Sequence, residues 1–83
     1  MNKHTTTIHA RCPFQPVWDY YTVTFTTDSV VQCEALEAAC EEVRGTTDTQ
    51  ESIGDSLRAI VQGDVSITVS GRHGGNCYTE VVR

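Results

Sequence analysis

The sequence predicts an α+β fold in which two helices cover one face of an antiparallel sheet. Two stretches alternate apolar and hydroxyl-bearing residues with period two, which is typical of half-buried strands. Between them, apolar residues recur three and four positions apart, which is the spacing of amphipathic helices. Strands before and after a pair of helices indicate an antiparallel sheet with both helices on one side. Because the chain has 83 residues, we expect one domain, residues 1–83.

The first strands are expected early in the chain. Residues 21–26, YTVTFT, alternate strictly and predict a half-buried strand. Residues 27–29 are expected to form a turn, and residues 30–31, two valines, a short return strand. Residues 1–11, MNKHTTTIHAR, are expected to form an N-terminal arm outside the sheet.

Two helices are predicted next, and each is followed by a glycine that can end it. The first carries its apolar side chains over residues 36–43 and ends at Gly45. The second carries them over residues 53–61 and ends at Gly63. The apolar positions are Leu36, Ala39, Cys40 and Val43 in the first helix, and Ile53, Leu57, Ile60 and Val61 in the second.

Two further strands follow the helices. Residues 65–70, VSITVS, alternate again, and a Gly-Gly-Asn turn at 74–76 separates them from a last strand at 78–82. An open sheet of this kind has unpaired edges, and a short chain has a small core. Pairing edges between subunits would solve both problems, so we expect a ring-forming homo-oligomer.

The charge distribution argues against a generic nucleic-acid binder. The net charge is −5 and the pI is about 4.9, whereas such proteins are usually basic. Eight carboxylates lie between Asp28 and Asp55 with Arg44 as the only cation, which indicates a solvated helical face. No stretch reaches the roughly 20 apolar residues of a membrane helix, and no signal-peptide core is present. We expect a soluble cytoplasmic protein that does not bind membranes.

The four cysteines do not form a disulfide or zinc pattern. Cys33 and Cys40 lie seven positions apart on one predicted helix, about 10 Å apart and too far to bridge. No Cys/His spacing typical of structural zinc occurs, and no metal is expected. We expect Cys33, Cys40 and Cys77 to be packing residues, which leaves Cys12.

The segment 12–21, CPFQPVWDYY, holds a thiol and a carboxylate in a stiff stretch. Cys12 and Asp19 lie seven positions apart, separated by two prolines and Trp18. Either residue has a simpler interpretation, because free cysteines are often buried apolar groups and aspartate is common in turns. Together they place a thiol and a carboxyl group in one stiff segment, which raises the question of what the pair does.

This segment and the order of elements resemble the QueF-like proteins of the tunnelling fold (T-fold). In the QueF family a Cys-Pro precedes an aspartate by seven residues at the start of a strand, as Cys12 and Asp19 do here. A His-Glu pair opens the family's second helix, where this chain has Gln50-Glu51. The family's V-x-G-[RK] strand end and Gly-Gly turn have counterparts in Val69, Gly71, Arg72, Gly74 and Gly75.

The resemblance also implies a branch of the family. The nitrile reductases carry an E-S-K-S-L-K run tied to NADPH use, whereas residues 32–37 here read QCEALE, without a lysine. The short QueF-like amidinotransferases also lack the run. They add ammonia to the nitrile of 7-cyano-7-deazaguanine in tRNA, giving archaeosine. An NADPH-dependent nitrile reductase acting on the free base, and a non-catalytic T-fold module that binds a purine-like ligand, remain alternatives.

The resemblance implies roles for several residues. Cys12 would attack the nitrile carbon to form a thioimide, and Asp19 would donate a proton, with burial beside Trp18 and the prolines keeping its carboxyl protonated. Ammonia is the only co-substrate expected, and NADPH would be needed only by a reductase. Whether the base is free or in tRNA or DNA stays open, and sites in this fold commonly lie between subunits.

Binding roles are implied for residues outside this segment. Glu51 would accept hydrogen bonds from the guanine-like edge of the base, although it could instead form a helix cap with Asp48. Gln50 could also bond the base. Arg72 and His73 could contact a phosphate or form a solvated hairpin tip. Trp18 could stack on a base, or pack in the core or in a subunit interface.

Overall fold

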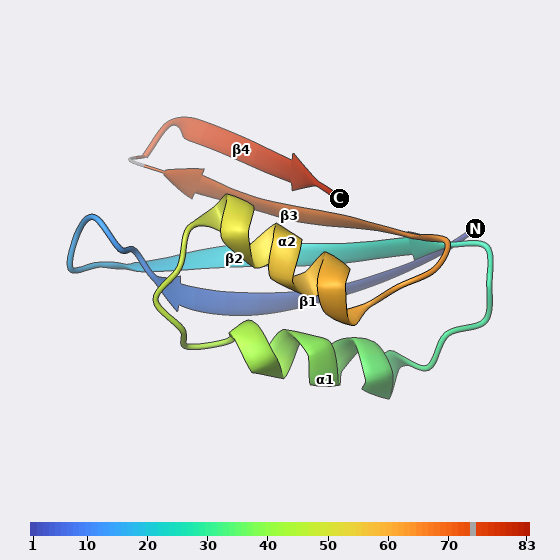
Figure 1. Cartoon of the computed structure of the whole chain (residues 1–83). Coiled ribbons are helices and arrows are strands. Elements are labelled where there is room, and N and C mark those ends of the chain that lie inside the picture. The colour runs from blue at the N-terminus through green and yellow to red at the C-terminus, as the bar shows by residue number, and fades with distance from the viewer. Residues whose placement is uncertain (74) are drawn as a thin grey trace.

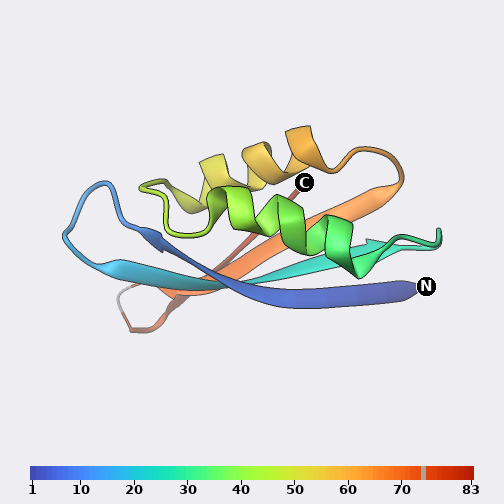
Figure 2. The same cartoon turned by 90° about the horizontal axis from the view of Figure 1, so that it is seen from below.

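The computed structural model describes residues 1–73 and 75–83, and it has the predicted α+β class. The elements run β1 (Asn2–Arg11), β2 (Trp18–Thr27), α1 (Cys33–Val43), α2 (Gln50–Ile60), β3 (Val65–His73) and β4 (Cys77–Val82) (Figure 1). The strands form one antiparallel sheet in the order β1-β2-β3-β4. Both helices lie on the same face of it (Figure 2).

The prediction of an N-terminal arm over residues 1–11 is wrong, because these residues form the first strand. β1 pairs with β2 from Asn2 opposite Thr27 to Arg11 opposite Trp18. Threonine is a good strand former, and Ile8 and Ala10 turn inward, 2% and 1% exposed. The first strand pair is therefore β1–β2.

The short return strand predicted at residues 30–31 is also wrong. β2 already has β1 on one edge and β3 on the other, so β2 has no free edge to pair with residues 30–31. Val30 is 98% exposed. The element order β-β-α-α-β-β is thus correct, but its first strand comes from before the cysteine segment.

The core lies between the sheet and the two helices. Every second residue of the strands points inward, and burying each large apolar side chain contributes about 1.5–3 kcal/mol. The buried apolar residues are Ile8, Ala10, Tyr21, Val23, Phe25, Leu36, Ala39, Cys40, Val43, Ile53, Leu57, Val65, Ile67, Val69 and Val81. Ile60, predicted to join them, is the last residue of α2 and is 43% exposed. Val61 packs against the core beyond it.

The four cysteines are free thiols with different surroundings. Only Cys40 packs in the core, where burial raises the pKa of its thiol to about 11. Cys33 and Cys77 begin α1 and β4 and are exposed, so the expectation that both are packing residues is wrong. Within the described residues no helix is long and apolar enough to cross a membrane.

The loop between the helices holds the end of β1, and this contact positions the candidate site. The N–H of Arg11 donates to the carbonyl of Thr46 at 2.8 Å, and the N–H of Asp48 donates to the carbonyl of Arg11 at 3.1 Å. The N–H of Gly45, whose φ of 81° suits glycine, donates to the carbonyl of His9 at 2.7 Å. Cys12, the residue after β1, is thereby held close to the start of α2.

Candidate active site

A cavity of about 140 Å³ lies where β1 ends and α2 begins. It gathers five of the residues predicted for the site, although they are far apart in the sequence. Neither Trp18 nor Arg72 lines it. The lining residues are Cys12, Pro13, Phe14, Asp19, Tyr21, Asp48, Thr49, Gln50, Glu51 and His73.

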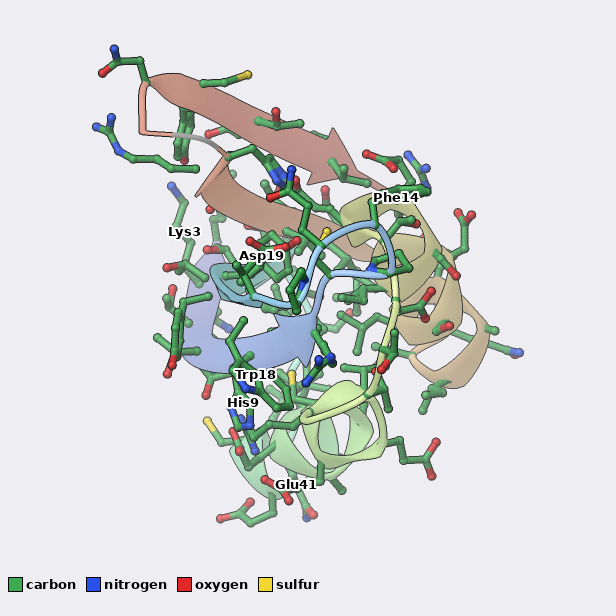
Figure 3. The ribbon with its side chains drawn as sticks, turned by 90° about the vertical axis from the view of Figure 1, so that its left-hand side faces the viewer. Lys3, His9, Phe14, Trp18, Asp19 and Glu41 are labelled. Atoms are coloured by element: carbon green, nitrogen blue, oxygen red, sulfur yellow. The ribbon has the colours of Figure 1, made fainter. Side chains whose placement is uncertain are left out.

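The segment that carries Cys12 is a tight loop between β1 and β2. The N–H of Cys12 donates to the carbonyl of Val17 at 2.9 Å, and the N–H of Val17 donates to the carbonyl of Gln15 at 2.8 Å. Proline lacks an N–H and fixes φ, so the two prolines stiffen this loop without leaving a donor unpaired. Cys12 is partly exposed at its base, and Phe14 projects from it, 83% exposed (Figure 3).

Asp19 faces the cavity beside Tyr21, a residue that the sequence placed only on the apolar face of a strand. Residues 19 and 21 of β2 point to the same side of the sheet, and the Tyr21 hydroxyl donates to Asp19 Oδ2 at 3.4 Å. Burial, followed by the neighbouring Asp19 carboxylate, raises the pKa of Tyr21 far above its usual range. Cys12 and Glu51 contribute smaller effects in the same direction. The sequence could have indicated Tyr21 as a site residue, because residues two apart on a strand, such as 19 and 21, share a face.

Trp18 does not bury Asp19, which corrects that expectation. Adjacent residues of a strand point to opposite faces, so Trp18 lies on the sheet face without helices. There its ring makes an edge contact with the His9 ring at 5.4 Å, and Figure 3 shows the two side by side, away from Asp19. Trp18 and Arg72 line an open hollow of about 560 Å³ that Asp19 also borders.

Gln50 is buried, 2% exposed, and its side chain bonds to three groups of the protein. Its Nε2 donates to the carbonyls of Val69 at 2.8 Å and Thr79 at 2.9 Å, which uses both amide hydrogens. Its Oε1 lies 2.6 Å from His73 Nε2. Because this oxygen can only accept, His73 must carry its proton on Nε2. Gln50 therefore fixes the orientation and tautomer of His73.

His73 belongs to the cavity and not to a solvated hairpin tip. Its ring is part-buried at the end of β3, with its centroid 6.0 Å from that of Tyr21. Arg72, the preceding residue, is exposed, and its Nη1 donates to the carbonyl of Gly75 at 3.4 Å. Gly74, part of the predicted turn, lies outside the described residues.

Glu51 is not used as a helix cap, contrary to the alternative involving Asp48. The N-cap of α2 is Thr49, whose Oγ1 accepts from the N–H of Ser52 at 3.1 Å. Asp48 Oδ1 instead accepts from the N–H of Thr49 at 3.1 Å. Glu51 is exposed on the first turn of α2, and its carboxylate borders the cavity.

Gly71 on β3 leaves the space that the Tyr21 ring occupies. A Cβ at Gly71 would lie 2.6 Å from Tyr21 Cδ1 and 3.0 Å from the carbonyl oxygen of Tyr20. A contact as short as 2.6 Å essentially never occurs in proteins, so any larger residue would displace the ring or the strand. The absence of a side chain at Gly71 therefore lets the phenol reach Asp19.

The sheet, the paired helices and their order define the tunnelling fold (T-fold). The crystal structure of the archaeosine synthase QueF-Like in the apo form has this fold. It matches 99% of this chain and 89% of its own with a TM-score of 0.78, at 21% sequence identity. No protein-family model and no curated protein sequence matches the chain.

Proposed function

We propose that this protein is an amidinotransferase-type enzyme that converts the nitrile of 7-cyano-7-deazaguanine to an amidine. The observation that carries the proposal is the cavity lined by Cys12, Asp19 and Glu51 together. A thiol, a carboxyl group and a second carboxylate are the groups that nitrile addition and guanine recognition require. The fold shared with the archaeosine synthase supports the same chemistry.

The first step is addition of the Cys12 thiolate, whose proton has passed to solvent, to the nitrile. The Cys12 sulfur bonds to the nitrile carbon, and one C≡N electron pair moves to nitrogen. That nitrogen takes a proton from Asp19, which lines the same cavity. The product is a covalent thioimide and an Asp19 carboxylate.

The second step replaces sulfur with nitrogen. Ammonia attacks the thioimide carbon, and Asp19 receives a proton from the incoming amine. The tetrahedral adduct then collapses, the C–S bond breaks, and the thiolate leaves with its electron pair. The amidine retains both nitrogens, Cys12 returns as the thiolate and Asp19 as the protonated acid, so the cycle consumes only ammonia.

Recognition falls to Glu51 and to the size of the cavity. The Glu51 carboxylate can accept from the ring N–H and the exocyclic amine of a guanine-like edge together. The volume of about 140 Å³ is below the ~300–1,000 Å³ of ordinary ligand pockets. Such a space suits one bicyclic base, and a sugar and phosphate attached to the base would lie outside it.

The test is the intact mass of the protein after incubation with 7-cyano-7-deazaguanine. We expect a mass increase equal to the whole base, because addition releases nothing. Cys12→Ala should abolish the adduct, and Cys77→Ala, which removes an exposed thiol outside the cavity, should retain it. Ammonium should discharge the adduct as the amidine. A short RNA and a short DNA carrying the base are incubated in parallel.

Three results would contradict the proposal. Discharge of the adduct by NADPH and not by ammonium would assign a nitrile reductase. Reversible binding of the base without an adduct would assign a purine-binding module. Neither adduct nor binding, with the free base or either nucleic acid, would leave no role for the cavity in nitrile chemistry.

A further inference from the structure

The Tyr21 side chain lies in the cavity that holds the residues assigned to the reaction. Its hydroxyl donates to Asp19 Oδ2 at 3.4 Å, and Cys12 and Glu51 line the same cavity. Tyr21 is 2% exposed, and its contact with Asp19 is part-buried. A buried polar group of this kind needs its partner, because an unmade hydrogen bond there costs about 1–3 kcal/mol.

We infer that Tyr21 is a positioning residue that acts through Asp19, holding one carboxyl oxygen so that the other faces the nitrile. This inference rests on the proposed function. When Asp19 gives its proton to the nitrile nitrogen, negative charge develops on the carboxylate. The Tyr21 O–H already points at Oδ2, and hydrogen bonds from O–H to a charged oxygen are shorter and stronger than neutral ones. Tyr21 thus stabilises the product of the proton transfer.

Tyr21 keeps its own proton throughout this step. Its pKa lies far above the usual range, first because of burial and then because of the Asp19 carboxylate. At neutral pH the phenol is therefore a donor and cannot serve as the base. The moving proton passes only from Asp19 to nitrogen, and Tyr21 contributes a hydrogen bond.

The neighbouring residues show that the position is specific. Tyr20 precedes Tyr21 on the same strand but points to the opposite face and is 73% exposed. Gly71 leaves the gap that the Tyr21 ring occupies. Tyr20 therefore provides a matched control that carries the same hydroxyl without access to the cavity.

The experiment measures the rate of thioimide formation by intact mass in the wild type, Tyr21→Phe, Tyr20→Phe, Asp19→Asn and the Tyr21→Phe/Asp19→Asn double variant. We expect Tyr21→Phe to slow adduct formation about 10–100-fold, part of the ~10²–10⁴-fold that a positioned proton donor contributes. Tyr20→Phe should equal the wild type. When Asp19→Asn is already present, adding Tyr21→Phe should have little further effect, since groups that act as a unit are not additive. Affinity for 7-deazaguanine, which lacks the nitrile, should be unchanged.

The outcomes separate this inference from the proposed function. A wild type that forms no adduct overturns the proposed function and the role of Tyr21 with it. A wild type that forms the adduct, with Tyr21→Phe within twofold of its rate, overturns the inference alone. Multiplicative losses in the double variant, or an equal loss of affinity for 7-deazaguanine, would also overturn it by showing a general structural role.

Discussion

Gln50→Leu should destabilise the fold strongly, although it exchanges side chains of similar size. The Gln50 amide joins α2 to both β3 and β4 through the carbonyls of Val69 and Thr79, and it also accepts from His73. Leucine fills the space but leaves three polar groups without this partner. Each buried unsatisfied group costs about 1–3 kcal/mol, and His73 can turn toward water, so we expect a net loss of about 2–4 kcal/mol.

Urea unfolding followed by fluorescence of the single tryptophan measures this loss. For a domain of this size, 1 kcal/mol corresponds to a shift of roughly 4–8 °C in Tm, so thermal melting should show a fall of about 10–30 °C. Gln62→Leu is the matched control, because Gln62 is exposed and donates one long hydrogen bond of 3.4 Å to Ala59. A loss below about 1 kcal/mol in Gln50→Leu would refute the bridging role argued from these contacts.

Four further predictions follow from the fold. Gly71→Ala should cost about 1–3 kcal/mol in urea unfolding, because the new methyl overlaps the Tyr21 ring, and an unchanged midpoint would contradict the close packing. Iodoacetamide at pH 7 should label Cys12 fastest, then Cys33 and Cys77, while buried Cys40 reacts only on unfolding; equal rates for the first three would argue against an activated Cys12. Because the pKa of Cys40 is about 11 in the fold against an ordinary 9.0, the unfolded chain loses this proton first. Stability present below pH 9 should therefore decline up to about pH 11, and less so in Cys40→Ala, as urea midpoints across this range would show. Light scattering should show a closed oligomer, and a monomer at micromolar concentration would contradict the prediction of a ring-forming homo-oligomer.

Most of the fold was predictable because its signals are local. Alternation over residues 21–26 and 65–70 and helical spacing over residues 36–43 and 53–61 each depend on neighbours in the sequence. β1 was missed because only Ile8 and Ala10 are apolar in a run of threonine and histidine. The strand is recognised only when β2 is seen to need a partner on that edge, which is a property of the whole sheet.

The site was predictable only in part, for a similar reason. Cys12 and Asp19 are joined by a short motif, and the structure brings both to one cavity. The bonds of Gln50 to two strands and the gap at Gly71 involve residues about 20 or more positions away, which no local pattern indicates. Trp18 was misplaced because proximity in the sequence was treated as proximity in space, whereas strand alternation separates it from Asp19.

The histidine of the cavity shows how this chain departs from the family motif. In the His-Glu pair that opens the second helix of the QueF family, this chain has Gln50, which suggests a lost acid–base group. The structure places the His73 ring at the same cavity from β3, with its Nε2 bound to Gln50 Oε1 at 2.6 Å. The residue that replaces the histidine thus holds another one in a defined tautomer. A comparison of motifs alone indicates that the imidazole is missing, but the cavity contains the imidazole of His73. Because Gln50 bonds to this ring, its loss should disturb the orientation of His73 as well as the fold.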